Sequence, residues 1–176
     1  MQQVASERIA NAVRDVPDFP KPGIIFKDIT PILSDGALFR ESVDLFIKAC
    51  EVLRPDKIVG IDARGFLFGA AVAYQLGVGF VPVRKKGKLP YERKEMSYVL
   101  EYGEATIEMH ADAISPGDRI VLVDDLLATG GTSAAAARLI AAAGGNLLEA
   151  QFLIELEFLS GRKLLEPVPV RAFLKY

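Results

Sequence analysis

The chain is predicted to fold as an α/β protein with a mostly parallel, twisted sheet flanked by helices. Short apolar runs alternate along its 176 residues with segments of helical spacing, a pattern typical of parallel strands joined by crossover helices. The chain is also 51% hydrophobic with a net charge of -2, so it can bury a substantial core and is not expected to be disordered or to bind nucleic acid through general charge. No linker or internal repeat divides it, so we expect a single domain over residues 1–176.

The first half of the chain contains helices, a proline-rich segment and the first strands. Apolar spacing predicts an amphipathic helix near residues 5–16, and the proline-rich stretch 16–33 follows it. A second helix is predicted over 36–53 because its apolar residues fall on one stripe. The elements expected next are a buried strand at 57–62, a helix at 66–76 and a strand at 79–83.

The second half begins with a polar run, residues 84–97, that has many charges but neither the helix nor the strand period. We expect it to be a long surface loop. Residues 98–102 and 105–110, on either side of Gly103, are typical of a β-hairpin. The remaining elements predicted are a strand at 120–123, a helix at 132–143 and a strand at 147–156.

Cysteine content and the N-terminal sequence predict a cytoplasmic location. Cys50 is the only cysteine, so no internal disulfide can form, and its place in an apolar helical stripe predicts a buried thiol. The N-terminal residues have no apolar core of the signal-peptide type, and no stretch approaches the ~20 apolar residues of a membrane span. His110 is the only histidine, which excludes a His-rich metal site, and no phosphate-binding P-loop motif is present.

The segment VDDLLATGGTS, residues 123–133, is the strongest candidate for a ligand site. Gly130 and Gly131 open the backbone before a predicted helix, so that successive N–H groups can converge on a phosphate. Ligands of open α/β sheets lie at the carboxyl ends of the strands, where IDARG (61–65), VRKKGK (83–88) and this segment all follow predicted strands. The three segments are therefore expected to converge on one site.

Asp124 and Asp125 stand beside a loop that must attract negative charge. One interpretation is that they bind Mg²⁺. A second is that they accept hydrogen bonds from the hydroxyls of a sugar whose phosphate lies in the glycine loop. A third interpretation is a plain helix-capping turn with Thr132 or Ser133 as N-cap. A ribose 5-phosphate reconciles the opposite requirements, because its phosphate would meet the loop while its vicinal diol meets the carboxylates.

The segment VLVDDLLATGGT resembles the phosphoribosyl-pyrophosphate loop of type I phosphoribosyltransferases. Further segments stand in the order and at the spacing of that family's adenine-specific members, and the likeness covers nearly the whole chain: PDFPKPGIIFKDITPIL, IDARGFLFG, VRKKGKLP and LEYG. The resemblance implies the type I phosphoribosyltransferase fold, with a hood at about 1–34, a core at about 35–176 and a flexible β-hairpin loop. It also implies a homodimer that converts adenine and phosphoribosyl pyrophosphate into AMP and pyrophosphate with Mg²⁺, which the substrate carries rather than a protein cluster.

The resemblance assigns the polar end of the ligand. Asp124 and Asp125 would accept hydrogen bonds from the ribose hydroxyls, and Arg64 would fork onto pyrophosphate oxygens. Arg84 would reach across the dimer to the partner's pyrophosphate, with Lys88 in the adjoining loop; taken alone, these cations also fit a solvated basic surface. The 5′-phosphate would be held by Ala128, Thr129, Gly130, Gly131 and Thr132.

The resemblance also assigns the purine end. Backbone groups of Ile25 and Lys27 would meet the polar edge of adenine, while Phe26 and Leu126 would enclose the ring. Glu101 would be the catalytic acid or base near the imidazole nitrogens of the purine, although strand alternation alone makes it merely exposed. Lys27 stands where the family often has arginine, and YERKEMS (91–97) is an unusual version of the loop.

Two other classes of function are weighed against this one. A non-enzymatic regulator that senses phosphoribosyl pyrophosphate would need an effector segment, for which the chain has no spare length. A transferase acting on hypoxanthine, guanine, xanthine or orotate would share the fold, but the hood segment and LEYG favour adenine.

Overall fold

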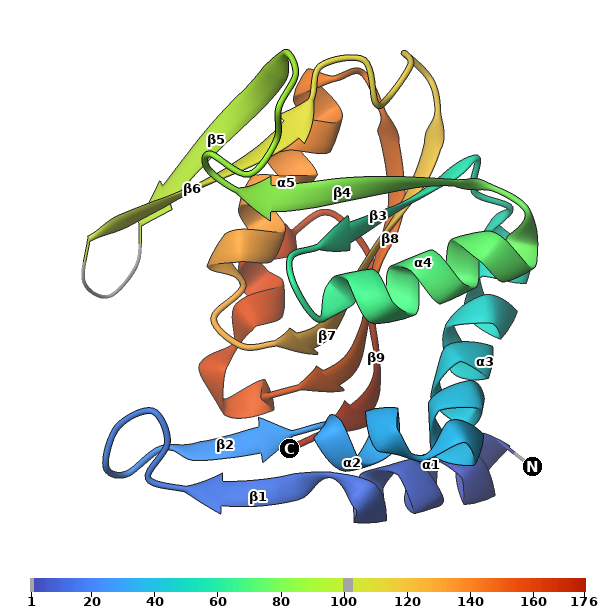
Figure 1. Cartoon of the computed structure of the whole chain (residues 1–176), viewed down its shortest axis with the longest axis vertical. Helices are drawn as coiled ribbons and strands as arrows, with labels where there is room; N and C mark the ends of the chain where they lie inside the picture. The colour runs from blue at the N-terminus through green and yellow to red at the C-terminus, as the bar shows by residue number, and fades with distance from the viewer. Residues whose placement is uncertain (1, 100–102) are drawn as a thin grey trace. The chain divides into compact units, whose positions relative to one another are not determined.

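The computed structural model describes residues 2–99 and 103–176 (Figure 1). The chain divides into two compact units, residues 1–46 and 47–176. No helix in the described part of the chain is long and apolar enough to cross a membrane. The predicted division into a hood of about 1–34 and a core of about 35–176 stays a prediction.

The first unit contains a short antiparallel strand pair between helices. Its elements are α1 (Gln2–Ala12), β1 (Arg14–Pro17), β2 (Ile25–Asp28), α2 (Thr30–Ser34) and the start of α3 (Gly36–Leu53). The helix predicted to reach residue 16 ends at residue 12, so that part of the prediction is wrong. Pro17 disfavours helical backbone at the residue before it, and β1 pairs instead with β2, where Lys27 Nζ lies 2.6 Å from Asp15 Oδ1.

Helix α3 has the bounds that the sequence predicted. It begins at Gly36 because Asp35 accepts hydrogen bonds from the backbone N–H groups of Ala37 and Leu38, at 2.8 and 3.0 Å. Its residue Cys50 is fully buried, as predicted, and burial raises the pKa of the thiol to about 12.

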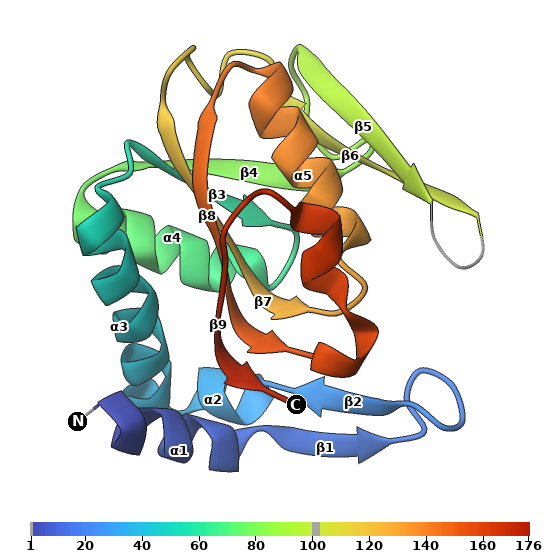
Figure 2. The same ribbon diagram turned by 180° about the vertical axis from the view of Figure 1, so that it is seen from behind.

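The described part of residues 47–176 forms one seven-stranded sheet in the order β5-β6-β4-β3-β7-β8-β9 (Figures 1 and 2). The pairs from β4 through β3, β7 and β8 to β9 are parallel, whereas β6 pairs antiparallel with β4 and with β5. The predicted fold class, a mostly parallel sheet flanked by helices, is therefore confirmed. The strands are β3 (Lys57–Ile61), β4 (Gly79–Lys85), β5 (Arg93–Val99), β6 (Glu104–His110), β7 (Arg119–Leu127), β8 (Asn146–Glu155) and β9 (Val170–Lys175).

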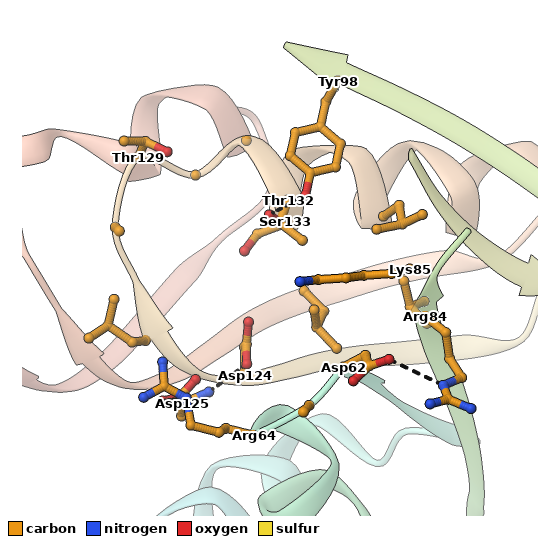
Figure 3. A pocket seen from close by; sticks show the side chains of 18 residues that line it. Asp62, Arg64, Arg84, Lys85, Tyr98, Asp124, Asp125, Thr129, Thr132 and Ser133 are labelled. Atoms are coloured by element: carbon orange, nitrogen blue, oxygen red, sulfur yellow. Dashed lines mark hydrogen bonds and ion pairs between the residues drawn. The ribbon is translucent and has the colours of Figure 1, made fainter. Parts of the chain in front are cut away.

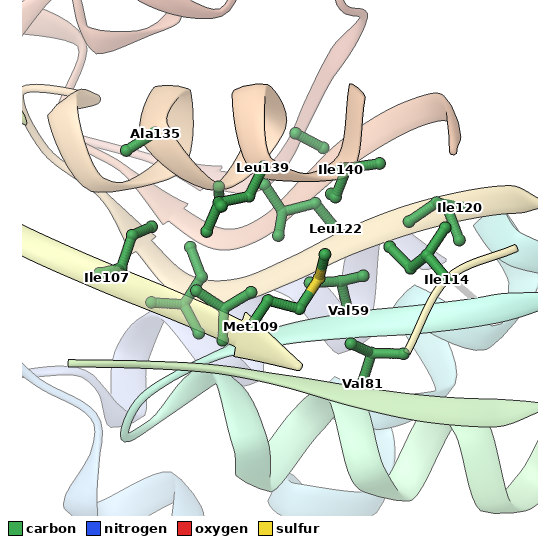
Figure 4. Packing of buried hydrophobic residues seen from close by; sticks show 14 of the residues in the cluster. Val59, Val81, Ile107, Met109, Ile114, Ile120, Leu122, Ala135, Leu139 and Ile140 are labelled. Carbon is green, nitrogen blue, oxygen red and sulfur yellow. The ribbon is translucent and has the colours of Figure 1, made fainter. Parts of the chain in front are cut away.

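Helices α4 (Gly65–Leu76) and α5 (Gly131–Ala142) cover opposite faces of this sheet (Figure 4). The central strands β3 and β7 are buried on both faces, which explains their continuous apolar runs. Under α5, Val59 and Leu122 pack with Leu139 and with Met109 of β6. This core fixes the carboxyl ends of β3, β4 and β7, where the candidate site lies.

The predicted surface loop at 84–97 is wrong in most of its length. Strand β4 continues to Lys85 and β5 begins at Arg93, which leaves only 86–92 outside the strands. The charges that hid the strand period are used in pairs at this sheet edge: Lys86 Nζ lies 2.6 Å from Glu95 Oε2. The predicted hairpin is confirmed as the antiparallel pair of β5 and β6 on either side of residues 100–102, which lie outside the described part.

The end of the chain holds elements that the sequence did not predict. Strand β7 continues through both aspartates to Leu127, and β8 is followed by the short 3-10 helices η1 (Glu157–Leu159) and η2 (Gly161–Leu165) and by strand β9. Strand β9 completes the parallel sheet beside β8.

Candidate active site

A cavity of about 210 Å³ opens at the carboxyl ends of β3, β4 and β7 (Figure 3). All three segments predicted to converge contribute to its lining, so their convergence is confirmed. The lining residues are Ile61, Asp62, Ala63, Arg64, Val83, Arg84, Lys85, Tyr98, Ile107, Asp124, Asp125, Leu126, Ala128, Thr129, Gly130, Gly131, Thr132 and Ser133.

Arg64 stands at the junction of β3 and α4. It is the N-cap residue of α4, where the helix dipole disfavours a cation, and Asp125 offsets this cost. Nε of Arg64 lies 3.0 Å from Oδ2 of Asp125. The side chain of Arg64 lines the cavity and remains 38% exposed, so an anion in the cavity can reach the guanidinium.

The first residue of α4, Gly65, lets this helix approach β7 closely. A Cβ at Gly65 would lie 2.8 Å from Asp124 Oδ1 and 2.8 Å from the carbonyl oxygen of Val123. Only glycine fits between the helix and the strand at this point. The carboxylate of Asp124 and the Arg64 turn are thus placed against each other by backbone packing.

Asp124 and Asp125 are adjacent on β7, and their carboxylates line the same cavity. Desolvation by burial, and then the charge of Asp125, raise the pKa of Asp124 well above its usual range. Burial also raises the pKa of Asp125, against the opposing effect of Arg64. Such a pair gains from a ligand that donates hydrogen bonds to the carboxylates, because those bonds stabilise the charged forms.

The turn from β7 into α5 leaves the N-terminus of the helix open. Gly130, at φ +85°, is the N-cap residue, and no side chain caps the helix. The interpretation of Thr132 or Ser133 as N-cap is therefore wrong: both lie inside the helix. The N–H groups of its first turn, together with the helix dipole, form a site suited to a phosphate.

A second glycine, Gly161, packs against the backbone of the turn between β7 and α5. A Cβ at Gly161, the first residue of η2, would lie 2.1 Å from the carbonyl oxygen of Ala128. A Cβ at Gly130 would in turn lie 2.3 Å from the carbonyl oxygen of Gly161. The two backbones are in direct contact, so residues 128–130 have a fixed support.

Basic residues occupy the opposite side of the cavity. Nε of Arg84 lies 3.2 Å from Asp62 Oδ2, and its guanidinium carbon lies 5.9 Å from the centre of the Phe66 ring. Lys85 follows Arg84 and extends into the cavity (Figure 3). Lys88, which the sequence predicted as a pyrophosphate ligand, is exposed on the segment 86–92 and is not among the lining residues.

Sequence reasoning missed several lining residues. Asp62 lies within IDARG and Lys85 within VRKKGK, but neither was given a role, and Ser133 adjoins Thr132. Tyr98 was assigned only to a hairpin, yet its hydroxyl accepts a hydrogen bond of 2.9 Å from Thr132 Oγ1. The signal for this strand was the alternation of Met96 and Tyr98 with polar residues, which matches the alternating burial along β5.

The residues predicted for the purine lie in three different parts of the chain. Leu126 lines the cavity. Ile25, Phe26 and Lys27 belong to β2 in the unit 1–46, where the ring of Phe26 meets that of Phe19 edge-to-face at 5.2 Å. Glu101 lies outside the described residues, and its role stays a prediction.

Comparisons with known proteins agree on one family. Residues 32–160 match the family model described as the phosphoribosyl transferase domain. The adenine phosphoribosyltransferase of Acidothermus cellulolyticus is 55% identical over 169 residues, which cover 96% of this chain and 96% of that protein. The crystal structure of adenine phosphoribosyltransferase from Thermoanaerobacter pseudethanolicus has a TM-score of 0.95 at 51% identity, covering 97% of this chain and 99% of that one. The Saccharomyces cerevisiae enzyme of the same name, in complex with an imino-altritol bisphosphate and adenine, has a TM-score of 0.93 at 42% identity, with 97% and 99% covered.

Proposed function

The chain belongs to the phosphoribosyltransferase family, and we propose that it catalyses purine salvage, transferring the 5-phosphoribosyl group from phosphoribosyl pyrophosphate to adenine to give AMP and pyrophosphate. The observation that carries this function is that paired carboxylates, an open helix N-terminus and arginines line one cavity. These three features match the ribose diol, the 5′-phosphate and the pyrophosphate of one substrate.

The 5′-phosphate binds at the turn of Ala128–Thr132. Backbone N–H groups at the start of α5 surround it, and the helix dipole adds favourable potential. Asp124 and Asp125 accept hydrogen bonds from the 2′- and 3′-hydroxyls of the ribose. This contact suits carboxylates whose pKa values are raised by burial, because the hydroxyls replace part of the lost hydration.

The pyrophosphate lies on the basic side of the cavity. Arg64 binds its oxygens through paired N–H donors, which a lysine cannot match, and Arg84 supplies the same kind of donors to the pyrophosphate site of the partner subunit. Lys88 contributes charge from the segment 86–92. These cations stabilise the negative charge that develops on the leaving group.

The reaction breaks the bond between C1′ and the pyrophosphate oxygen and forms the bond between C1′ and N9 of adenine. Positive charge develops on the ribose as the first bond weakens, and Asp124 and Asp125 hold the sugar so that C1′ faces the base. Glu101 acts as the general acid or base for a proton of the purine, a role that typically contributes about 10²–10⁴-fold in rate.

For the adenine ring we propose contacts with Phe26 and with Leu126. Backbone groups of Ile25 and Lys27 match its polar edge, where the 6-amino group donates and N1 accepts. Hypoxanthine presents the reverse pattern at both positions, which leaves buried polar groups unpaired at about 1–3 kcal/mol each. Sites of this kind reject the wrong partner by roughly 10⁴-fold.

Mg²⁺ is proposed as the cofactor and is bound by the substrate. No group of three or more potential metal-binding side chains is found in residues 2–99 and 103–176, but the carboxylates of Asp124 and Asp125 suit the water ligands of a substrate-bound ion. When bound, the ion neutralises charge on the pyrophosphate.

The active form is proposed to be a cytoplasmic homodimer in which Arg84 reaches the partner's pyrophosphate site. The outer face of α4 supports a dimer because it leaves apolar side chains in solvent, with Leu67 45% and Tyr74 88% exposed. This helix begins at Gly65, directly after Arg64, which lines the cavity.

A panel of purine bases tests the function. With phosphoribosyl pyrophosphate and Mg²⁺, adenine should give pyrophosphate release with kcat/KM about 10⁴-fold above hypoxanthine or guanine. Lys27→Ala should keep this preference, because its base contact is made by the backbone, whereas Phe26→Ala should weaken binding of every base. A kcat/KM for hypoxanthine or guanine equal to that for adenine would contradict the assignment.

A further inference from the structure

Glu108 is a buried carboxylate that the proposed reaction does not use. It lies on β6, its side chain is fully buried, and it is not among the residues that line the cavity. A buried charge is costly unless hydrogen bonds and opposite charge compensate it. The hydrogen-bond partners of Glu108 therefore indicate its role.

Those partners are backbone N–H groups of the segment 86–92. Oε1 of Glu108 accepts from Lys88 N at 2.7 Å and from Leu89 N at 2.6 Å, while Oε2 accepts from Gly87 N at 3.1 Å. Arg93 Nε lies 3.0 Å from Oε2 and supplies the opposite charge. Burial alone would raise the pKa of Glu108, but the backbone hydrogen bonds and Arg93 together lower it, so the carboxylate is ionised at neutral pH.

The carbonyl groups of the same segment are also held. Arg84 Nη1 donates to the carbonyl oxygen of Lys88, and Arg93 Nη1 to that of Leu89, each at 3.4 Å. The register of β4 and β6 pairs Arg84 with Glu108, so the carboxylate lies beside the strand end that carries Arg84. The backbone at residue 88 is thus fixed while the lysine side chain remains exposed.

We propose that Glu108 is a positioning residue for pyrophosphate binding: it holds residues 87–89 so that Lys88 and Arg84 are presented together to the diphosphate of the substrate. This inference rests on the proposed function, because it concerns the pyrophosphate end of that same site. Glu108 acts through the loop backbone and does not itself contact the ligand.

Glu95 provides a matched control on the neighbouring strand. It stands opposite Glu108 in the register of β5 and β6 and interacts with the same Arg93. Its described hydrogen bonds come from the side chains of Lys86 and Arg93 and not from loop backbone. Replacement of Glu95 therefore removes a carboxylate from the same sheet edge without releasing residues 87–89.

The experiment compares Glu108→Gln and Glu95→Gln in the full-length protein. Glutamine keeps the size of glutamate, but its NH₂ group faces a backbone N–H that needs an acceptor. For Glu108→Gln we expect amide hydrogen exchange over residues 86–92 to accelerate at least about tenfold. The KM for phosphoribosyl pyrophosphate should rise about tenfold or more, with the KM for adenine unchanged within about twofold. Glu95→Gln should leave both constants within about twofold of wild type.

Two results would overturn the proposal. One is faster exchange over 86–92 in Glu108→Gln with an unchanged KM for phosphoribosyl pyrophosphate; the other is an equal loss for both substrates with faster exchange throughout the chain. If Glu108→Gln does not fold, Glu108→Asp decides, because it keeps the charge but withdraws it by one methylene, and the same selective rise in KM is expected. A wild-type protein that turns over no adenine would contradict the proposed function separately, since the exchange measurement needs no substrate.

Discussion

Two sets of buried carboxylates in one sheet differ in what they bind. Glu108 on β6 is surrounded by donors of its own chain, which lower its pKa. Asp124 and Asp125 on β7 are also largely buried, yet their pKa values are raised. Asp124 accepts one short-range bond, from the N–H of Asp125 at 2.9 Å, and Asp125 faces Arg64.

The difference shows how a structural carboxylate is told from one that serves a ligand. Burial is common to both and does not separate them. What separates them is whether the acceptor capacity is used within the chain, as at Glu108, or left directed into a cavity, as at Asp124 and Asp125. A pKa that burial raises, with too few donors of the chain to lower it again, is the electrostatic sign of the second case.

The largest test removes the ligand-directed pair. Asp124→Asn combined with Asp125→Asn should lower kcat/KM for phosphoribosyl pyrophosphate about 10²- to 10⁴-fold, because each hydrogen bond to a charged group contributes roughly 1.5–3 kcal/mol. The fold should be kept, since both changes relieve a buried charge. Steady-state kinetics and circular dichroism measure the two effects, with the exposed Asp112→Asn as control. Activity within tenfold of wild type would contradict the inference that Asp124 and Asp125, unlike Glu108, serve a ligand.

A smaller effect is expected from moving Asp124 without changing it. The Cβ of Gly65→Ala would press on Asp124 Oδ1 and on the backbone of Val123, each at 2.8 Å. A displacement of about 1 Å at a reacting group costs roughly 10²-fold in rate. Gly36→Ala is the matched control, because nothing lies within 4 Å of its Cβ and its φ is not positive. Equal kinetics for both alanine variants would show that the close approach does not place the carboxylate.

The smallest expected effects are changes in stability, which should have opposite signs for Asp124→Asn and Glu108→Gln. The folded state raises the pKa of Asp124 above 3.8, so the free energy of unfolding falls as pH rises from 3.8 through the folded pKa. Asp124→Asn should therefore raise the Tm of the unliganded protein at pH 7, and the gain should vanish below pH 3.8. Glu108 has a lowered pKa, so its stabilisation is present above 4.5 and is lost as pH falls through the folded pKa, and Glu108→Gln should lower the Tm at pH 7.

Differential scanning calorimetry between pH 3.5 and 8 measures both shifts. They should amount to a few degrees, since about 1 kcal/mol moves Tm by roughly 2–4 °C in a domain of this size. Shifts of the same sign at pH 7 would contradict the comparison of the two sets.

The sequence predicted the parallel core well because β3, α4, β7 and α5 carry strong apolar periods. It failed where charges served the sheet: β5 was taken for a loop because Arg93 and Glu95 pair locally and across strands instead of facing open solvent. The last twenty residues were left unassigned, although β9 completes the sheet there. A periodic pattern of apolar residues reveals which strands and helices are buried. Charged residues that pair at a sheet edge produce no such pattern, so a strand like β5 is not recognised from the sequence.

The candidate site was predicted through its motifs, and the loops around Arg64, Arg84 and Asp125 do meet in one cavity. Two of the residues that the sequence did not reveal, Gly161 and Glu108, are placed by tertiary packing alone. Gly161 lies far from the motif in sequence, and only the fold brings it against Ala128. Glu108 was likewise just one polar residue of a strand, because its hydrogen bonds depend on how the chain turns back over β6.

The contact between Gly161 and the phosphate turn also sets the order in which the protein becomes competent during its synthesis. Residues 123–133 leave the ribosome before Gly161 does. Because synthesis proceeds at roughly 5–20 residues per second, the turn lacks its support for seconds. A nascent chain that stops short of residue 161 holds every motif residue but not the backbone against which the turn rests. Substrate can therefore bind at the supported turn only after residue 161 has been added to the chain.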